Sequence, residues 1–248
     1  ELKANKIHPE FNNELNREAI SKFLSFSYIP CPLSIYKGIS KLPPSHILCI
    51  DFLNKNEIIT SYWKLSINKN IDFSNDNFII ENLHKSLSKA VSDQMIADVP
   101  VGAFLSGGID SSLIVALMRE NSNNPINTFT IGYEDLAYDE SIHARSVAKY
   151  LGTNHNELVV SAQDLLDVVP KLPSLYDEPF ADSSQVPTFL VSQSARNNVT
   201  VALTGDGGDE VFGGYNRHLW AHKFWNKIRL LPRWLRNTIS NILASPSE

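Results

Sequence analysis

Short apolar segments alternate with amphipathic helical patterns from residue 79 to residue 204 of this chain. The helical patterns begin at Ile79 and recur in residues 111–121, 139–151 and 184–197, and the apolar segments are residues 99–105, 128–133, 157–160 and 199–204. A helix between two strands carries the chain back to the end of the sheet where the first strand began, so the two strands run parallel. The alternation therefore predicts an α/β fold, with a parallel sheet and helices on both of its faces.

The first 68 residues follow a different pattern. Apolar residues at helical spacing in residues 16–28 predict a short amphipathic helix, which Pro30 and Pro32 end. Residues 46–52 and 58–65 predict a β-hairpin. A polar segment, residues 66–77, separates this part from the rest. We therefore expect a small α+β domain over residues 1–68 and an α/β domain over residues 69–248.

The most informative stretch joins a predicted strand to a predicted helix and reads Leu105-Ser106-Gly107-Gly108-Ile109-Asp110-Ser111-Ser112. Glycines let backbone N–H groups approach an anion closely, and the serines add hydroxyl donors. The positive end of the helix dipole faces the same point. The turn therefore predicts a phosphate cradle, in which a Cβ on Gly107 is expected to obstruct the phosphate without disturbing the fold.

Two common phosphate-binding motifs do not fit this turn. Gly102 and Gly107 have the spacing of the first two glycines of a Walker A loop, but Gly108 stands where that loop needs lysine, and no GxGxxG occurs. The sequence therefore disfavours a Walker nucleotidase and a dinucleotide-binding Rossmann domain. A plain glycine turn with Asp110 or Ser111 as helix N-cap is the alternative.

A second glycine turn follows residues 199–204 and reads Thr204-Gly205-Asp206-Gly207-Gly208-Asp209-Glu210. Its three acidic groups repel one another unless solvent or a cation offsets their charge, and hard oxygen ligands suit Mg2+. If the two strands are neighbours, both turns lie at the carboxyl edge of the sheet, where open α/β folds bind ligands. The alternative is a solvated acidic loop that caps a helix starting near Asp209.

The first turn resembles the PP-loop of the ATP pyrophosphatases, whose signature is SGGxDSS after a core strand. Over residues 80–217 the chain resembles the synthetase domain of glutamine-dependent asparagine synthetases, on motifs at residues 106–112, 128–133, 151–155, 176–179 and 203–215. Residues 34–46 resemble the end of that family's glutaminase domain, with Ser45 where a glycine is expected. The resemblance implies a PP-loop ATP pyrophosphatase fold for residues 69–248 and the end of an Ntn-type glutaminase domain for residues 1–68.

The same resemblance implies a set of site residues. ATP would be bound by residues of both turns and one strand, namely Leu105, Ser106, Gly107, Gly108, Asp110, Ser111, Ser112, Ile131, Thr204 and Gly205. Asp110 and Asp209 would hold Mg2+. Asp206 is the catalytic candidate, because some members have a glutamate there that is linked to the adenylated intermediate. Four residues would border the substrate, unless they form a solvated turn and a helix cap: Asp177, Glu178, Ser183 and Ser184.

The implied activity converts aspartate, ATP and ammonia into asparagine, AMP and pyrophosphate through β-aspartyl-AMP, with glutamine supplying the ammonia in the full-length protein. In the family a cysteine at the mature N-terminus hydrolyses glutamine, whereas here Glu1 stands first and Cys31 and Cys49 are internal. The family's synthetase domain also continues further than residue 248. We therefore expect this chain to be an incomplete fragment of a longer enzyme.

Composition narrows the classes of partner. The longest apolar segments are far shorter than the roughly 20 residues of a membrane-spanning helix, and a net charge of −5 provides no basic field for nucleic acid. Two cysteines without CxxC spacing suggest neither zinc nor disulfides and fit a reducing cytoplasm. We expect a cytoplasmic protein with small-molecule substrates (aspartate, ATP, and ammonia or glutamine), possible homodimerisation, and no nucleic-acid or membrane partner.

Two rival functions and one unexplained segment remain. The chain could be another PP-loop ligase that activates a different carboxylate, such as a β-lactam-forming or polysaccharide-modifying relative, or a non-catalytic nucleotide-binding fragment. Residues 211–247 contain no acidic residue but six lysines or arginines and three of the four tryptophans. This pattern is typical of a nucleic-acid or membrane-surface helix. We favour instead a helical segment whose aromatic residues pack on a further part of the protein.

Overall fold

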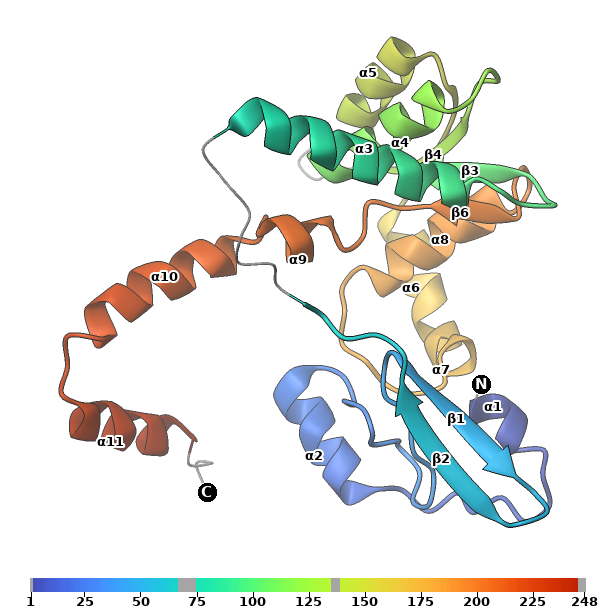
Figure 1. Cartoon of the computed structure of the whole chain (residues 1–248). Coiled ribbons are helices and arrows are strands. Elements are labelled where there is room, and N and C mark those ends of the chain that lie inside the picture. The colour runs from blue at the N-terminus through green and yellow to red at the C-terminus, as the bar shows by residue number, and fades with distance from the viewer. Residues whose placement is uncertain (1, 67–74, 135–138, 245–248) are drawn as a thin grey trace. The chain divides into compact units, whose positions relative to one another are not determined.

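The computed structural model describes residues 2–66, 75–134 and 139–244 (Figure 1). The chain divides into two compact units. The first comprises residues 1–89, 131–139 and 157–197, and the second comprises residues 90–130, 140–156 and 198–248. The predicted domain boundary after residue 68 lies outside the described residues and stays a prediction.

The N-terminal part of the first unit contains the predicted helix and hairpin. Its elements are α1 (Leu2–Asn5), α2 (Arg17–Phe26), β1 (His46–Asp51) and β2 (Asn56–Ser61). The side chain of Asn16 caps α2 by accepting the N–H groups of Glu18 and Ala19 at 3.0 and 3.3 Å. The strands pair antiparallel, with His46 opposite Ser61. Both predictions are confirmed.

A hydrophobic cluster in the first unit surrounds the end of β5 (Asn154–Val160). Val160, Val168 and Leu190 are buried together there, and Ile131 and Leu158 pack against them. The helices of this region are α6 (Ala162–Val168), α7 (Leu172–Leu175) and α8 (Gln185–Ala195), with a 3-10 turn at Val169–Lys171. The helix α3 (Asp76–Gln94) begins in the first unit and ends in the second. Ser161 and Asp164 form a capping box that begins α6. Its first residue, Ser161, follows directly after the last residue of β5, so the chain changes there from strand to helix.

The four-stranded sheet has the order β5-β4-β3-β6, with β3 (Val101–Phe104), β4 (Asn127–Tyr133), β5 (Asn154–Val160) and β6 (Val201–Leu203). The strand β3 runs parallel to both of its neighbours, because Ala103 lies opposite Thr128 on one side and Leu203 on the other. The predicted parallel sheet of an α/β fold is therefore confirmed. The adjacency of β3 and β6 also places the two glycine turns on neighbouring strands.

The second unit contains α4 (Ile109–Glu120), α5 (Ser141–Leu151), α9 (Gly208–Phe212), α10 (Asn216–Ile228) and α11 (Arg233–Ala244). Figure 1 shows α4 and α5 beside each other, and α4 packs on both α5 and β3. The buried core includes Ala103, Leu105, Val115, Met118 and Phe129. In the described part of the chain, no helix has the length and apolarity to cross a membrane.

Candidate functional site

The first glycine turn leads from β3 into α4, and hydrogen bonds of its own serines hold its shape. The N–H of Leu105 donates to the carbonyl of Phe129 at 2.9 Å, which keeps the start of the turn on the sheet. The N–H of Ser106 donates to the hydroxyl of Ser111 at 3.2 Å, and these two hydroxyl oxygens lie 3.0 Å apart. The N–H of Gly108 donates to the Ser106 hydroxyl at 3.3 Å. The first turn of α4 and the loop before it are thus one hydrogen-bonded unit.

Gly107 is required by the packing of the turn against α5. Its φ is +84°, and a Cβ there would lie 2.6 Å from the backbone nitrogen of Ala144 and 2.7 Å from the Cβ of His143. The expectation that a larger residue at Gly107 would spare the fold is therefore wrong. A Cβ on Gly108 would meet only the Ser106 hydroxyl, at 3.3 Å. The open side of the turn is at Gly108.

Neither Asp110 nor Ser111 caps α4. The N-cap is Gly108, which offers no side-chain capping hydrogen bond, and Asp110 and Ser111 lie inside the first turn of the helix. The capping alternative is therefore wrong. The hydroxyl oxygen of Ser112 is buried and has no hydrogen-bond partner among the residues that the structure describes. A buried donor without a partner is costly, so this hydroxyl fits a site that receives an anion.

The second glycine turn lies directly against the first. A Cβ on Gly205 would lie 2.7 Å from the backbone nitrogen of Ser111, and a Cβ on Gly208 would lie 2.6 Å from a carboxylate oxygen of Asp110. Only residues without a side chain let the two turns approach this closely. The expectation that both turns lie together at the carboxyl edge of the sheet is confirmed.

The three acidic residues of the second turn have different surroundings. Asp206 is exposed, and its N–H donates to the Thr204 hydroxyl at 3.1 Å. Asp209 is half-buried inside the first turn of α9. The helix thus starts near Asp209, as expected, but its N-cap is Gly207 and no side chain of the loop makes a capping hydrogen bond. Glu210 accepts a hydrogen bond from the Tyr215 hydroxyl at 2.6 Å.

That hydrogen bond, supported by the charges of Arg217 and His218, lowers the pKa of the Glu210 carboxyl below its ordinary value. The Arg217 guanidinium also lies 4.0 Å from the centre of the Tyr215 ring. The Glu210 carboxylate is therefore already bonded to Tyr215, in the connection between α9 and α10. Asp206 and Asp209 are the better candidates for ligand contact.

The carboxylates present fit a metal that arrives with its substrate. Within the described ranges, no group of three or more His, Cys, Asp and Glu side chains could hold a metal ion. Mg2+ is usually bound by one or two carboxylates together with substrate phosphates, rather than by a cage of protein ligands. Asp110 lies beside Gly208, and Asp209 follows Gly208 in the sequence. These two carboxylates fit this kind of site.

Ile131, Ser183 and Ser184 stay predictions. Ile131 lies in β4, on the part of that strand that belongs to the first unit, and packs against the cluster of Val160, Val168 and Leu190. Ser183 and Ser184 are exposed ahead of α8. The N–H of Ser184 donates to the Asp182 carboxylate at 2.8 Å, and the Ser184 hydroxyl makes no capping bond.

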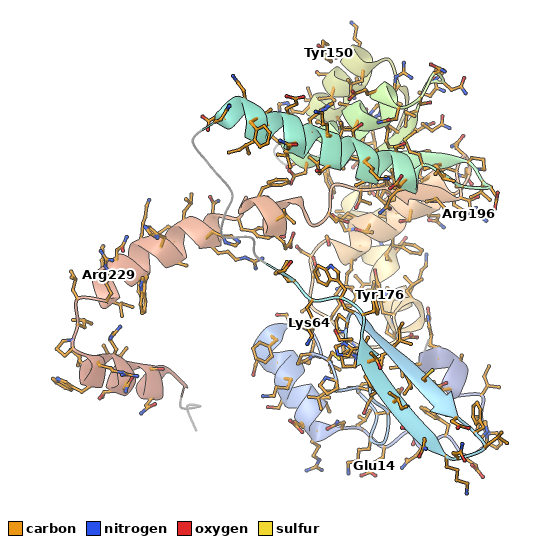
Figure 2. The ribbon with its side chains drawn as sticks, viewed as in Figure 1. Glu14, Lys64, Tyr150, Tyr176, Arg196 and Arg229 are labelled. Atoms are coloured by element: carbon orange, nitrogen blue, oxygen red, sulfur yellow. The ribbon has the colours of Figure 1, made fainter. Side chains whose placement is uncertain are left out.

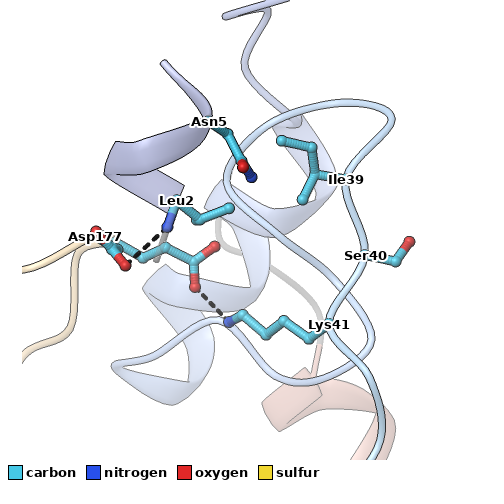
Figure 3. A pocket seen from close by; sticks show the side chains of 7 residues that line it. Leu2, Asn5, Ile39, Ser40, Lys41 and Asp177 are labelled. Atoms are coloured by element: carbon cyan, nitrogen blue, oxygen red, sulfur yellow. Dashed lines mark hydrogen bonds and ion pairs between the residues drawn. The ribbon is translucent and has the colours of Figure 1, made fainter. Parts of the chain in front are cut away.

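Asp177 and Glu178 contact the N-terminal segment of the first unit. Figure 2 labels their neighbour Tyr176, whose ring packs edge-on against Phe180 at 4.6 Å. Figure 3 shows the Leu2 N–H bonded to Asp177 on one side of a pocket of about 420 Å3 and Lys41 on the other. Burial raises the pKa of Asp177, but N–H groups of Leu2 and Lys3 and nearby positive charge outweigh it and hold that pKa below its ordinary value.

Sequence reasoning missed the partners of these carboxylates. Lys3 and Lys41 lie more than 130 positions away from Asp177 and Glu178 in the chain, and neither belongs to a recognisable motif. It also missed the support of Gly107 by α5 and the bond between Tyr215 and Glu210. No spacing rule connects the two lysines with these carboxylates or Gly107 with α5, because these residues are far apart in the sequence. Tyr215 and Glu210 are only five positions apart, and the Gly213-Gly214 pair between them signals a turn that returns the chain toward Glu210.

Comparison with known proteins gives one consistent family. The sequence profile of the family described as asparagine synthase matches residues 82–247. A Methanocaldococcus jannaschii protein with the provisional name glutamine-hydrolyzing asparagine synthetase 2 is 42% identical over 240 residues, which are 95% of this chain and 46% of that protein. Glutamine-hydrolyzing asparagine synthetase 1 of Bacillus subtilis is 33% identical over 203 residues, 82% of this chain and 32% of that protein. The chain thus spans half or less of these relatives.

Among solved structures, a glutamine-dependent NAD+ synthetase from Acinetobacter baumannii in complex with ADP is 16% identical, with 68% of this chain and 31% of that chain covered. The TM-score of this comparison is 0.42.

Proposed function

The chain belongs to the asparagine synthase family, and from that premise we propose that its two glycine turns bind ATP and activate the side-chain carboxylate of aspartate for amide formation. The observation that carries the proposal is the direct approach of the second turn to the first, with Gly205 and Gly208 against Ser111 and Asp110. A phosphate cradle and a pair of carboxylates at one sheet edge suit a reaction that releases pyrophosphate.

The first turn would bind the β- and γ-phosphates. Its supporting features are the open side at Gly108, the unpartnered Ser112 hydroxyl and the first turn of α4, whose dipole favours an anion. The proposed nucleotide site also includes Leu105, Ser106, Gly107, Ser111, Thr204 and Gly205. The pyrophosphate that leaves would stay held by the same groups that bound it in ATP.

The chemistry follows from the need to activate a carboxylate. An aspartate side-chain oxygen attacks the α-phosphorus, the bond to the bridging oxygen breaks, and pyrophosphate leaves with the electron pair. Ammonia then attacks the acyl carbon, and AMP leaves with the former carboxylate oxygen. Mg2+, when bound, would offset charge on the phosphates, and Asp110 and Asp209 would hold it. We propose Asp206 as the residue beside the adenylated intermediate, on its exposed position in the second turn.

The rival ligases differ in the carboxylate that they activate, and the names of the relatives do not favour them. Exchange of labelled pyrophosphate into ATP separates the candidates, because exchange needs a carboxylate that can be adenylated reversibly. We expect exchange with aspartate and Mg2+, and at most a tenth as much with glutamate, since one extra methylene costs about tenfold or more. Exchange with another carboxylate alone would identify a rival ligase, and no exchange with any would identify a nucleotide-binding protein.

A further inference from the structure

The side chain of Asp110 lies against Gly208 of the second glycine turn. A Cβ on Gly208 would lie 2.6 Å from both the Cγ and one carboxylate oxygen of Asp110, and 3.0 Å from the other oxygen. These are the three nearest atoms among the described residues, and none of them belongs to the backbone. The space that Gly208 leaves open is therefore the space beside which the Asp110 carboxylate lies.

Asp209 has the same relation to a glycine further along the chain. Its backbone carbonyl accepts the N–H groups of Gly213 and Gly214 at 2.9 and 3.1 Å, so the chain folds back over Asp209 where α9 ends. A Cβ on Gly214 would overlap one carboxylate oxygen of Asp209 and would lie 2.9 Å from its Cγ. The Asp209 Cα is 3.5 Å away, an ordinary van der Waals distance. Here too a glycine leaves room for a carboxylate.

Two nearby glycines have other reasons to be glycine. A Cβ on Gly205 would lie 2.7 and 2.9 Å from backbone atoms of the first glycine turn, so it would push the two turns apart. Gly213 has a left-handed φ of +73° and open space where its Cβ would be. Neither Gly208 nor Gly214 has a positive φ. A methyl group at these two positions meets the end of a side chain, which can rotate to another position, so it displaces the carboxylate rather than the backbone.

We propose that Gly208 and Gly214 are positioning residues for the Asp110 and Asp209 carboxylates, and that the room they leave sets the response of ATP binding to Mg2+. Gly208 directly precedes Asp209, so one short segment fixes the places of both carboxylates. Mg2+ demands nearly ideal octahedral geometry, with oxygen ligands at about 2.0–2.1 Å, so a displaced carboxylate binds it less well. The inference deepens the proposed function, on which the metal role of the two carboxylates rests.

The first test measures ATP binding by calorimetry at a series of Mg2+ concentrations, with the protein as its gene encodes it. We expect the Mg2+ concentration for half-maximal binding to rise about threefold to tenfold in Gly208→Ala and in Gly214→Ala. No rise in one of these variants would overturn the positioning role of that glycine.

Gly213→Ala is the matched control, because its methyl group strains a left-handed backbone but touches no carboxylate. We expect its urea midpoint to fall by about 0.3–1 M and its Mg2+ response to stay within about twofold. A rise in the required Mg2+ as large as that in Gly214→Ala would show that any disturbance of this segment weakens Mg2+ binding, and would overturn the proposal.

The second test uses double-mutant cycles in urea unfolding and needs no ligand. Gly214→Ala is made in the unaltered protein and in the Asp209→Ala variant. Gly208→Ala is likewise combined with Asp110→Ala. Loss of the carboxylate removes the obstacle, so we expect the effect of each glycine substitution on the urea midpoint to become more favourable by about 0.3 M or more. Equal effects in both backgrounds would show that the glycine makes no room for the carboxylate.

The two tests separate this inference from the proposed function. If the unaltered protein binds no ATP at any Mg2+ concentration, the proposed function fails, and the cycles still decide whether the two glycines hold the carboxylates in place. If ATP binds in an Mg2+-dependent way and the cycles show no coupling, the proposed function stands and the positioning role is overturned.

Discussion

At the scale of single residues, the two adjacent glycines of the first turn have separate roles. Gly107 has a left-handed backbone and lies against Ala144 and His143, whereas Gly108 faces open space beside Ser106. A substitution at the first position therefore disturbs the fold, and one at the second disturbs only what enters the turn. Of these two consecutive residues, Gly107 therefore matters for the stability of the fold and Gly108 for the binding of a ligand.

We predict that Gly108→Ala folds normally and binds ATP at least about tenfold more weakly, because its Cβ enters the space through which phosphates approach the backbone. Gly107→Ala is the matched control, and we expect it to lower the free energy of unfolding by about 2 kcal/mol or more. Calorimetric titration with ATP and urea unfolding give both quantities. Full ATP affinity in a folded Gly108→Ala protein would exclude this turn as the phosphate site.

The buried hydroxyl of Ser112 leads to a second prediction. This group has no partner among the described residues, so Ser112→Ala removes an unsatisfied donor. We expect the free energy of unfolding to stay the same or rise by up to about 1 kcal/mol, while ATP affinity falls about fivefold. Thermal unfolding with and without ATP measures both effects. Lower stability without ATP would show that the hydroxyl serves the fold instead.

The proposed metal role of Asp110 and Asp209 gives a third prediction. Asp110→Asn and Asp209→Asn keep side-chain size but remove one charge each, so we expect the Mg2+ concentration needed for half-maximal ATP binding to rise about tenfold. Glu210→Gln is the control, because Glu210 is bonded to Tyr215. Calorimetry at fixed ATP and varied Mg2+ measures this dependence. Equal Mg2+ dependence in all three variants would contradict the assignment.

At the scale of elements, the start of α6 is held by the Ser161 and Asp164 capping box. Hydrogen bonds from the hydroxyl and N–H of Ser161 lower the pKa of the Asp164 carboxyl. A depressed pKa in the folded state means that this stabilisation is present above the unfolded value of about 3.9 and is lost as pH falls through the folded value.

We therefore predict that Asp164→Asn is less stable than the unaltered chain at neutral pH, and that the difference shrinks as the pH falls below about 4. Urea unfolding of both proteins between about pH 2.5 and pH 7 measures the difference. A difference that stayed constant down to the lowest pH would show that the charge of Asp164 makes no contribution.

The elements with strong periodic patterns could be predicted from sequence, and the short ones could not. The α2 helix, the hairpin and the strands could all be predicted from the spacing of apolar residues. The helices α1 and α7 have four residues each, too few to show a helical period. Their positions depend on distant contacts, such as that of Lys3 with Leu175.

Some features of the candidate site could likewise be predicted from the sequence, and others could not. Both glycine turns follow strands, so their meeting at the carboxyl edge could be predicted once the strands were taken as neighbours. The consequence of substituting Gly107 could not, because it depends on the backbone of α5, more than 30 residues further along the chain. The partners of Asp177 and Glu178 were hidden for the same reason.

At the scale of the whole molecule, the chain spans 46% of its Methanocaldococcus jannaschii relative, and its surface has apolar groups in its C-terminal helices. Trp220, Trp225 and Trp234 are each more than half exposed. The Arg236 guanidinium lies 5.7 Å from the Trp225 ring centre, so part of this basic surface is directed at its own aromatic residues. The interpretation of these helices as a packing surface stays a prediction.

The central claim is that ATP is split at its α-phosphorus by the side-chain carboxylate of aspartate. The most direct test supplies aspartate labelled with oxygen-18 in that carboxylate, together with ATP, Mg2+ and ammonium, to the protein as its gene encodes it. Mass spectrometry of the products then follows the label. The account predicts one labelled oxygen in AMP and none in pyrophosphate, because the carboxylate oxygen leaves with the AMP. Formation of ADP with labelled inorganic phosphate, or of AMP without label, would contradict it.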